Sequence, residues 1–140
     1  MTARDHNRLL GIFFMILGGL TLLGALGIGL IYGGMGTMLI AAGPDEEAAI
    51  AGGIFVVLAI GIAFFLLVFS IFFLISGWKV YKEAQIGKIL GIIASVLSLT
   101  SFPLGTALGA YGLWFFLGEQ GKSLYDGLIH RNAPPPNSWQ

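Results

Sequence analysis

The side chains that could do chemistry in this chain are few and far apart along the sequence. Each of the two histidines, His6 and His130, has one acid nearby, Asp5 or Asp126. A bound metal would need at least one or two further ligands, since zinc sites in proteins use three or four. We therefore expect both histidines to be surface residues that hold no metal.

The sequence also lacks the usual catalytic patterns. It has no cysteine, which excludes disulfides, thiol catalysis and thiolate metal sites. It has no serine–histidine–acid set, no pair of catalytic acids, no phosphate loop and no dinucleotide-binding fingerprint. Met35 and Met38 carry the soft sulfur that copper(I) accepts, but in an apolar segment we expect them to pack. The sequence thus predicts no enzyme activity, no metal and no cofactor.

Transport of a solute is a second possible activity, and it would use hydroxyl groups within the apolar segments. The candidates for such a polar path are Ser95, Ser98, Thr106 and Tyr111. Ser95 and Ser98 are about one helical turn apart and could face a neighbouring helix. Hydroxyls in apolar helices more often bond to a carbonyl of their own helix. The sequence leaves both uses open.

The distribution of charge indicates where the remaining residues lie. The chain is 56% hydrophobic and 10% charged, whereas soluble domains have about 25% charged residues. The net charge is zero, which gives no reason to expect a nucleic-acid partner. The only charges inside the long apolar first half are acidic, at 45–47. All seven basic residues lie in three patches: Arg4 and Arg8; Lys79, Lys82 and Lys88; Lys122 and Arg131.

Because basic residues stay on the cytoplasmic side of a membrane, this pattern predicts a multi-pass protein with both termini in the cytoplasm. We predict four transmembrane helices, near residues 9–32, 44–76, 81–101 and 103–123. The first has 24 uncharged residues, enough to cross about 30 Å of hydrocarbon. It is too long for the core of a signal peptide, and no A-x-A cleavage site follows it. Pro44 and the acids after it suit a helix start.

The sequence leaves two arrangements open for the third and fourth helices. Pro103 disfavours helix at the residue before it, so we expect a turn of two or three residues there. Each helix then has 21 residues and can span if Lys88 extends its amine to the interface. The alternative is a re-entrant hairpin that turns back inside the membrane, which requires protein to cover its turn.

Glycine is frequent in the predicted helices, and it lets helix backbones approach closely in lipid. With 22 glycines in 140 residues, G-x-x-x-G pairs also arise by chance. We expect the glycines of the third and fourth helices to receive another helix or another subunit, because the two rows lie at different depths. The candidate helix-packing residues are Gly29, Gly33, Gly87, Gly91, Gly105 and Gly109.

One segment carries a resemblance to a known family. Residues 102–114 read F-P-L-G-T-A-L-G-A-Y-G-L-W. This resembles the P-L-G-T-A-L-G-x-Y-x-L-W segment of uncharacterised small bacterial four-helix integral membrane proteins, and the Arg8-Leu9-Leu10-Gly11 start fits the same pattern. The resemblance implies a four-span protein of the bacterial inner membrane. It carries over no catalytic or binding residue.

The sequence therefore predicts an all-α integral membrane four-helix bundle, with one domain over 1–140 and a Pro-rich tail at 131–140. Its expected partners are the lipid bilayer and either further copies of the chain or another membrane protein. The first functional hypothesis is a non-enzymatic scaffold or accessory subunit that acts through helix packing. The alternative is a small oligomeric channel or transporter.

Overall fold

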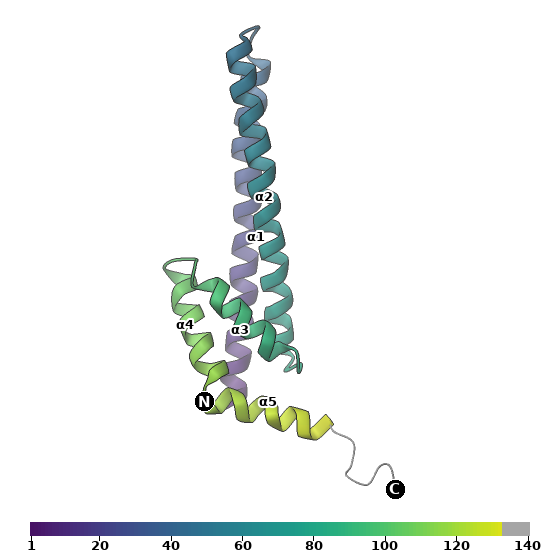
Figure 1. Ribbon diagram of the computed structural model, residues 1–140, viewed down its shortest axis with the longest axis vertical. Helices are drawn as coiled ribbons and strands as arrows, with labels where there is room; N and C mark the ends of the chain where they lie inside the picture. The colour runs from purple at the N-terminus through teal and green to yellow at the C-terminus, as the bar shows by residue number, and fades with distance from the viewer. Residues whose placement is uncertain (133–140) are drawn as a thin grey trace. The chain divides into compact units, whose positions relative to one another are not determined.

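The computed structural model describes residues 1–132, and within this range every element of regular secondary structure is an α-helix. The prediction of an all-α fold is therefore confirmed for the described residues. Of the predicted Pro-rich tail, residues 133–140 lie outside the described part of the chain. The helices, in order, are α1 (Ala3–Ala41), α2 (Glu46–Tyr81), α3 (Gly87–Ser98), α4 (Leu104–Leu117) and α5 (Glu119–Asn132) (Figure 1).

The chain divides into two compact units. Unit 1 comprises Met1–Ile16 and Phe73–Gln140, and unit 2 comprises Leu17–Phe72. Unit 1 therefore contains the first turns of α1, the last turns of α2, and α3 to α5. Unit 2 contains the remainder of α1 and α2 with the turn that joins them.

Unit 2 is a helical hairpin in which α1 and α2 contact each other through small residues. A Cβ built on Gly36 would lie 2.7 Å from the carbonyl oxygen of Gly52, so the two backbones touch here. Ala25 and Ala59 are buried, and the Ser70 hydroxyl donates a hydrogen bond of 2.8 Å to the carbonyl of Gly18. Glycine and alanine thus hold α1 and α2 close together, as small residues do between membrane helices.

The first two helices are longer than the sequence prediction. The predicted helix 9–32 corresponds to α1, which begins at Ala3 and continues to Ala41. The predicted helix 44–76 corresponds to α2, which runs from Glu46 to Tyr81. The glycines at 33–36 do not end α1. Gly36 instead lies at the close contact with Gly52, so its lack of a side chain serves packing within the helix.

The third and fourth helices are shorter than the predicted spans 81–101 and 103–123. α3 has 12 residues and α4 has 14, so at 1.5 Å per residue they are about 18 Å and 21 Å long. Residues 82–86 form a turn in which Glu83 has a φ of 55°, a conformation that stops a helix. Gly118 is extended, which ends α4 and starts α5 as a separate helix.

α3 and α4 pack against each other through glycines of α4 and carbonyls of α3. Positions 105 and 109 face the backbone carbonyls of Ser98 and Ser95, and Gly91 lies under the ring of Phe116. The expectation that each glycine row receives a different helix is therefore wrong for these three positions. The glycines of α3 and α4 do not contact each other, but Gly91, Gly105 and Gly109 contact non-glycine residues of the same hairpin. Pro103 directly precedes α4, which begins at Leu104. The connection between α3 and α4 comprises residues 99–103 and is longer than the predicted two or three residues, because α3 ends at Ser98.

Candidate functional site

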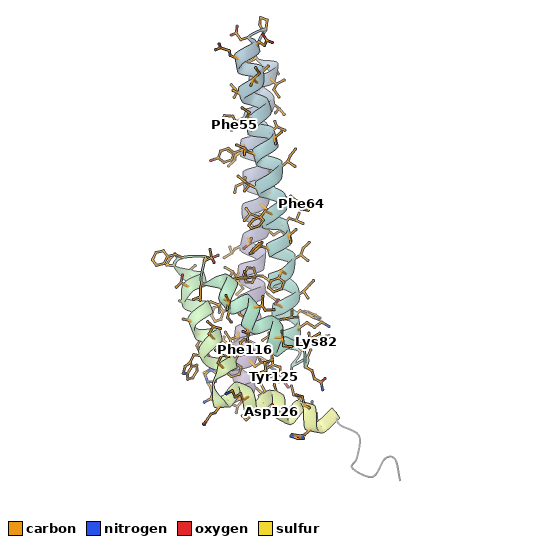
Figure 2. All side chains as sticks on the ribbon, in the orientation of Figure 1. Phe55, Phe64, Lys82, Phe116, Tyr125 and Asp126 are labelled. Carbon is orange, nitrogen blue, oxygen red and sulfur yellow. The ribbon has the colours of Figure 1, made fainter. Side chains whose placement is uncertain are left out.

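A buried polar cluster joins α1, α2 and α5 in unit 1. Asn7 of α1 is fully buried, and its Nδ2 donates a hydrogen bond of 2.6 Å to the carbonyl oxygen of Val80 in α2. The hydroxyl of Tyr125 donates a hydrogen bond of 2.9 Å to Oδ1 of Asn7. Tyr125 is 2% exposed and extends from α5 toward Phe116 of α4 (Figure 2). One side-chain amide therefore links three helices that are distant in sequence.

Burial also determines the protonation of this cluster. Loss of solvent raises the pKa of the Tyr125 phenol well above its ordinary value of 10.0, and the hydrogen bond to Asn7 offsets only part of that effect. The hydroxyl therefore stays protonated and remains a donor to Asn7 at physiological pH. α5 places Tyr125 here because Gly121, Tyr125 and Leu128, spaced by three or four residues, form its buried face.

A charged group lies beside this cluster. The carboxylate of Glu83 lies between two arginines of α1, with 3.5 Å from Oε2 to Nε of Arg4 and 4.0 Å from Oε1 to Nε of Arg8. The Glu83 side chain is 12% exposed, whereas both arginine side chains are more than half exposed. Such distances describe ionic attraction more than directed hydrogen bonds. These ion pairs connect the turn at 82–86 with the first turns of α1.

His6 lies in an aromatic environment. Its Nδ1 is in hydrogen-bond contact with the hydroxyl of Tyr111 in α4. The centroids of the Tyr111, Trp114 and Phe115 rings lie 6.0 to 6.4 Å from the centroid of the imidazole ring. Within residues 1–132, no group of three or more His, Asp or Glu side chains is placed to hold a metal ion. His6 is thus partly buried rather than a surface residue, and it joins α1 to α4.

The four hydroxyls proposed for a polar path each have a protein partner. Ser95 and Ser98 are fully buried and donate hydrogen bonds of 2.7 Å to the carbonyls of Gly91 and Ala94 in their own helix. Thr106 donates a hydrogen bond of 2.9 Å to the carbonyl of Leu99, across the α3–α4 turn. Tyr111 contacts His6. These hydroxyls therefore serve contacts within the fold.

The candidate helix-packing glycines fall into two groups. In unit 1, a Cβ at position 87, 91, 105 or 109 would collide with neighbouring atoms; at Gly87 these include the carbonyl oxygen of Lys79 at 2.8 Å. In unit 2, a Cβ built on Gly29 would lie 3.8 Å from the Cβ of Ala63, and one built on Gly33 would have no neighbour within 4 Å. An open apolar groove of about 260 Å³ adjoins Gly29. Its lining residues are Leu22, Ala25, Leu26, Gly29, Leu30, Ala63, Phe64 and Leu67.

Sequence reasoning missed the residues at the centre of the cluster. Asn7 and Tyr125 are 118 residues apart, and a single sequence carries no sign of their contact. Glu83 gave no signal beyond its place among lysines.

Comparison with known proteins gives no match among family models, curated proteins or solved structures. The function must therefore be inferred from the residues described above. What they can do chemically is to hold helices together through buried hydrogen bonds and to present cations at one end of unit 1.

Proposed function

We propose that this chain is a small integral membrane protein that acts through helix packing, as a scaffold or accessory subunit. One observation carries the proposal. α1 and α2 are long and apolar enough to cross a membrane, yet only 28% and 11% of their most apolar 18-residue windows are buried. The apolar core helix of a soluble protein is mostly buried, because exposed apolar surface in water is unfavourable. Lipid is the solvent that suits helices of this kind.

The lengths of the helices support two full spans and a re-entrant hairpin. α1 and α2, at about 58 Å and 54 Å, exceed the roughly 30 Å hydrocarbon core, so part of each extends into the headgroup layer or beyond. α3 and α4, at about 18 Å and 21 Å, are too short to cross it. Of the two arrangements that the sequence left open, these lengths favour the hairpin. Both arrangements leave the two termini on one side, and the basic patches favour the cytoplasmic side. The family resemblance favours a bacterial inner membrane.

The α3–α4 turn has the properties that lipid requires. Phe102 is 86% exposed and Leu104 is 73% exposed, which suits contact with lipid and not with water. Several backbone polar groups of the turn bond within the hairpin: the amide of Ser101 donates to the carbonyl of Ser98, and that of Gly105 donates to the carbonyl of Ser101. Internal hydrogen bonding of this kind is the condition under which irregular backbone is tolerated at membrane depth.

The scaffold function makes a prediction about assembly. Several glycines of unit 2 have open space where a side chain would lie, among them Gly19, Gly24, Gly27 and Gly61. Glycine costs about 0.8–1 kcal/mol per helical position relative to alanine, so we expect a partner helix to use some of these positions. Cross-linking in membranes should capture a second copy or a partner membrane protein. A chain that stays monomeric at every concentration and cross-links to nothing contradicts the scaffold function.

Reconstitution in liposomes separates this proposal from a channel or transporter. Because the candidate hydroxyls bond within the fold, we expect liposomes that contain the protein to stay tight to ions and small solutes. Reproducible flux that disappears when Ser95 and Ser98 are replaced by alanine would overturn the scaffold function in favour of a channel.

A further inference from the structure

One tight turn of unit 1 gathers basic side chains from three helices. α2 ends at Tyr81 and α3 begins at Gly87, and the turn between them is closed by a hydrogen bond of 3.0 Å from the amide of Ala84 to the carbonyl of Lys79. Lys82 lies in this turn. α1 reaches it through the contacts of its two arginines with Glu83. We name the group the basic turn, and its members are Arg4, Arg8, Lys79, Lys82 and Lys88.

The basic turn has a surplus of positive charge. Two acids lie beside its members: Glu83, between the arginines, and Asp5, next to Arg4 in the chain, whose carboxylate accepts hydrogen bonds from the backbone amide and hydroxyl of Thr2. Five cations and two carboxylates leave a net charge of +3. Within residues 1–132, the lysines of the basic turn take part in no ion pair. Their ammonium groups are therefore available to an external anion.

The aromatic residues beside the basic turn indicate where it lies. Trp78 and Tyr81 are 51% and 39% exposed at the end of the apolar helix α2. The ammonium of Lys82 lies 4.6 Å from the centroid of the Trp78 ring, a cation–π contact. Tryptophan and tyrosine are enriched at the level of the lipid headgroups, where lysine side chains also extend.

We propose that the basic turn binds the phosphate groups of anionic phospholipids in the cytoplasmic leaflet. The inference rests on the proposed membrane location of the chain. A surface that is apolar on the α2 side and cationic on the turn side matches a phospholipid, whose acyl chains and phosphate occupy adjacent layers. The acidic turn of unit 2, with Asp45, Glu46 and Glu47, offers anionic lipid no such attraction.

The test compares two variants that each remove two charges. The protein, reconstituted in vesicles of equimolar phosphatidylglycerol and phosphatidylcholine, is extracted in mild detergent, and the lipids that remain bound are measured by mass spectrometry. The wild-type protein should retain phosphatidylglycerol in excess. K79Q/K82Q should lower the ratio of the two lipids at least about fivefold, the effect of one basic residue near an anionic surface. The control K122Q/R131Q, on α5, should change it less than about twofold.

Several outcomes would overturn the inference. Equal losses in the two variants would indicate attraction by net charge alone. A wild-type ratio equal to that of the vesicles, or thermal stabilisation by inorganic phosphate with none by phosphatidylglycerol, would exclude a lipid site here. These results leave the proposed function intact as long as the chain remains in the membrane fraction. Recovery of the wild-type chain in the soluble fraction would instead remove the proposed function. Thermal unfolding in phosphatidylcholine alone checks that both variants fold.

Discussion

Replacing Gly77 by leucine should cost unit 1 about 3 kcal/mol or more of folding free energy, at the upper end of overpacking effects. α1 and α2 cross here with their backbones in contact. A Cβ at position 77 would lie 2.7 Å from the carbonyl oxygen of Gly11 and 2.8 Å from the backbone nitrogen of Met15. Backbone atoms cannot rotate away as the end of a side chain can, so the helices must separate.

Gly61 provides the matched control, since it lies in the same helix. Nothing lies within 4 Å of the position that its Cβ would occupy. Leucine has a higher helix propensity than glycine, so Gly61→Leu should leave thermal stability unchanged or raise it slightly. Thermal unfolding of the two variants in detergent, compared at a concentration where the protein is monomeric, measures the difference. Equal losses at both positions would show that the contact between α1 and α2 is not as described.

Loss of the buried amide should have the second large effect. Asn7→Leu leaves the Tyr125 hydroxyl buried without its acceptor, which should destabilise the fold by about 2–3 kcal/mol. The Val80 carbonyl is less affected, because it also accepts a hydrogen bond from the amide of Glu83. Tyr125→Phe should cost about 1–2 kcal/mol, since it leaves Oδ1 of Asn7 unpaired. The double variant should cost less than the sum of the two, because it removes both partners together.

High pH provides an independent check of the same cluster. The pKa of Tyr125 is raised in the folded chain, so its contribution to stability is complete below about pH 10. Above that pH the phenol ionises in the unfolded chain, whereas the buried phenol of the folded chain stays protonated. The free energy of unfolding therefore falls as the pH rises. Tyr125→Phe should lose less stability than the wild-type protein between pH 9 and about pH 11. Parallel losses in the two proteins would mean that Tyr125 is not buried.

The helical class and the apolar character of the first two helices could be predicted because they depend on composition and charge pattern. The ends of helices could not. The glycines at 33–36 look like a helix end in sequence, but Gly36 lies inside α1 because a second backbone packs against it. The end of α4 at Leu117 depends on the extended backbone of Gly118, and a glycine in sequence does not reveal its conformation.

The candidate site was harder to predict than the fold. The basic residues of the turn were visible as a patch, because charge is a property of single residues. Their gathering around Glu83 with Arg4 and Arg8 depends on contacts between residues more than 70 positions apart. The same holds for His6, which the sequence suggested to be a surface residue and which packs among aromatic rings of α4. Pairing at long range follows from the packing of helices, which one sequence does not specify.

The accessibility of the α3–α4 turn in intact cells tests the proposed membrane topology most directly. The chain has no cysteine, so single-cysteine variants report one position each. Gly43→Cys marks the outer turn and Lys122→Cys the cytoplasmic side. With a membrane-impermeant maleimide, Gly43→Cys should react in intact cells and Lys122→Cys only after the cells are opened. Ser101→Cys should react in neither case, and only once detergent removes the lipid. Reaction of Ser101→Cys in intact cells, at the rate of Gly43→Cys, would contradict the re-entrant hairpin. Reaction of Ser101→Cys together with the other two variants in opened cells without detergent would also contradict the re-entrant hairpin.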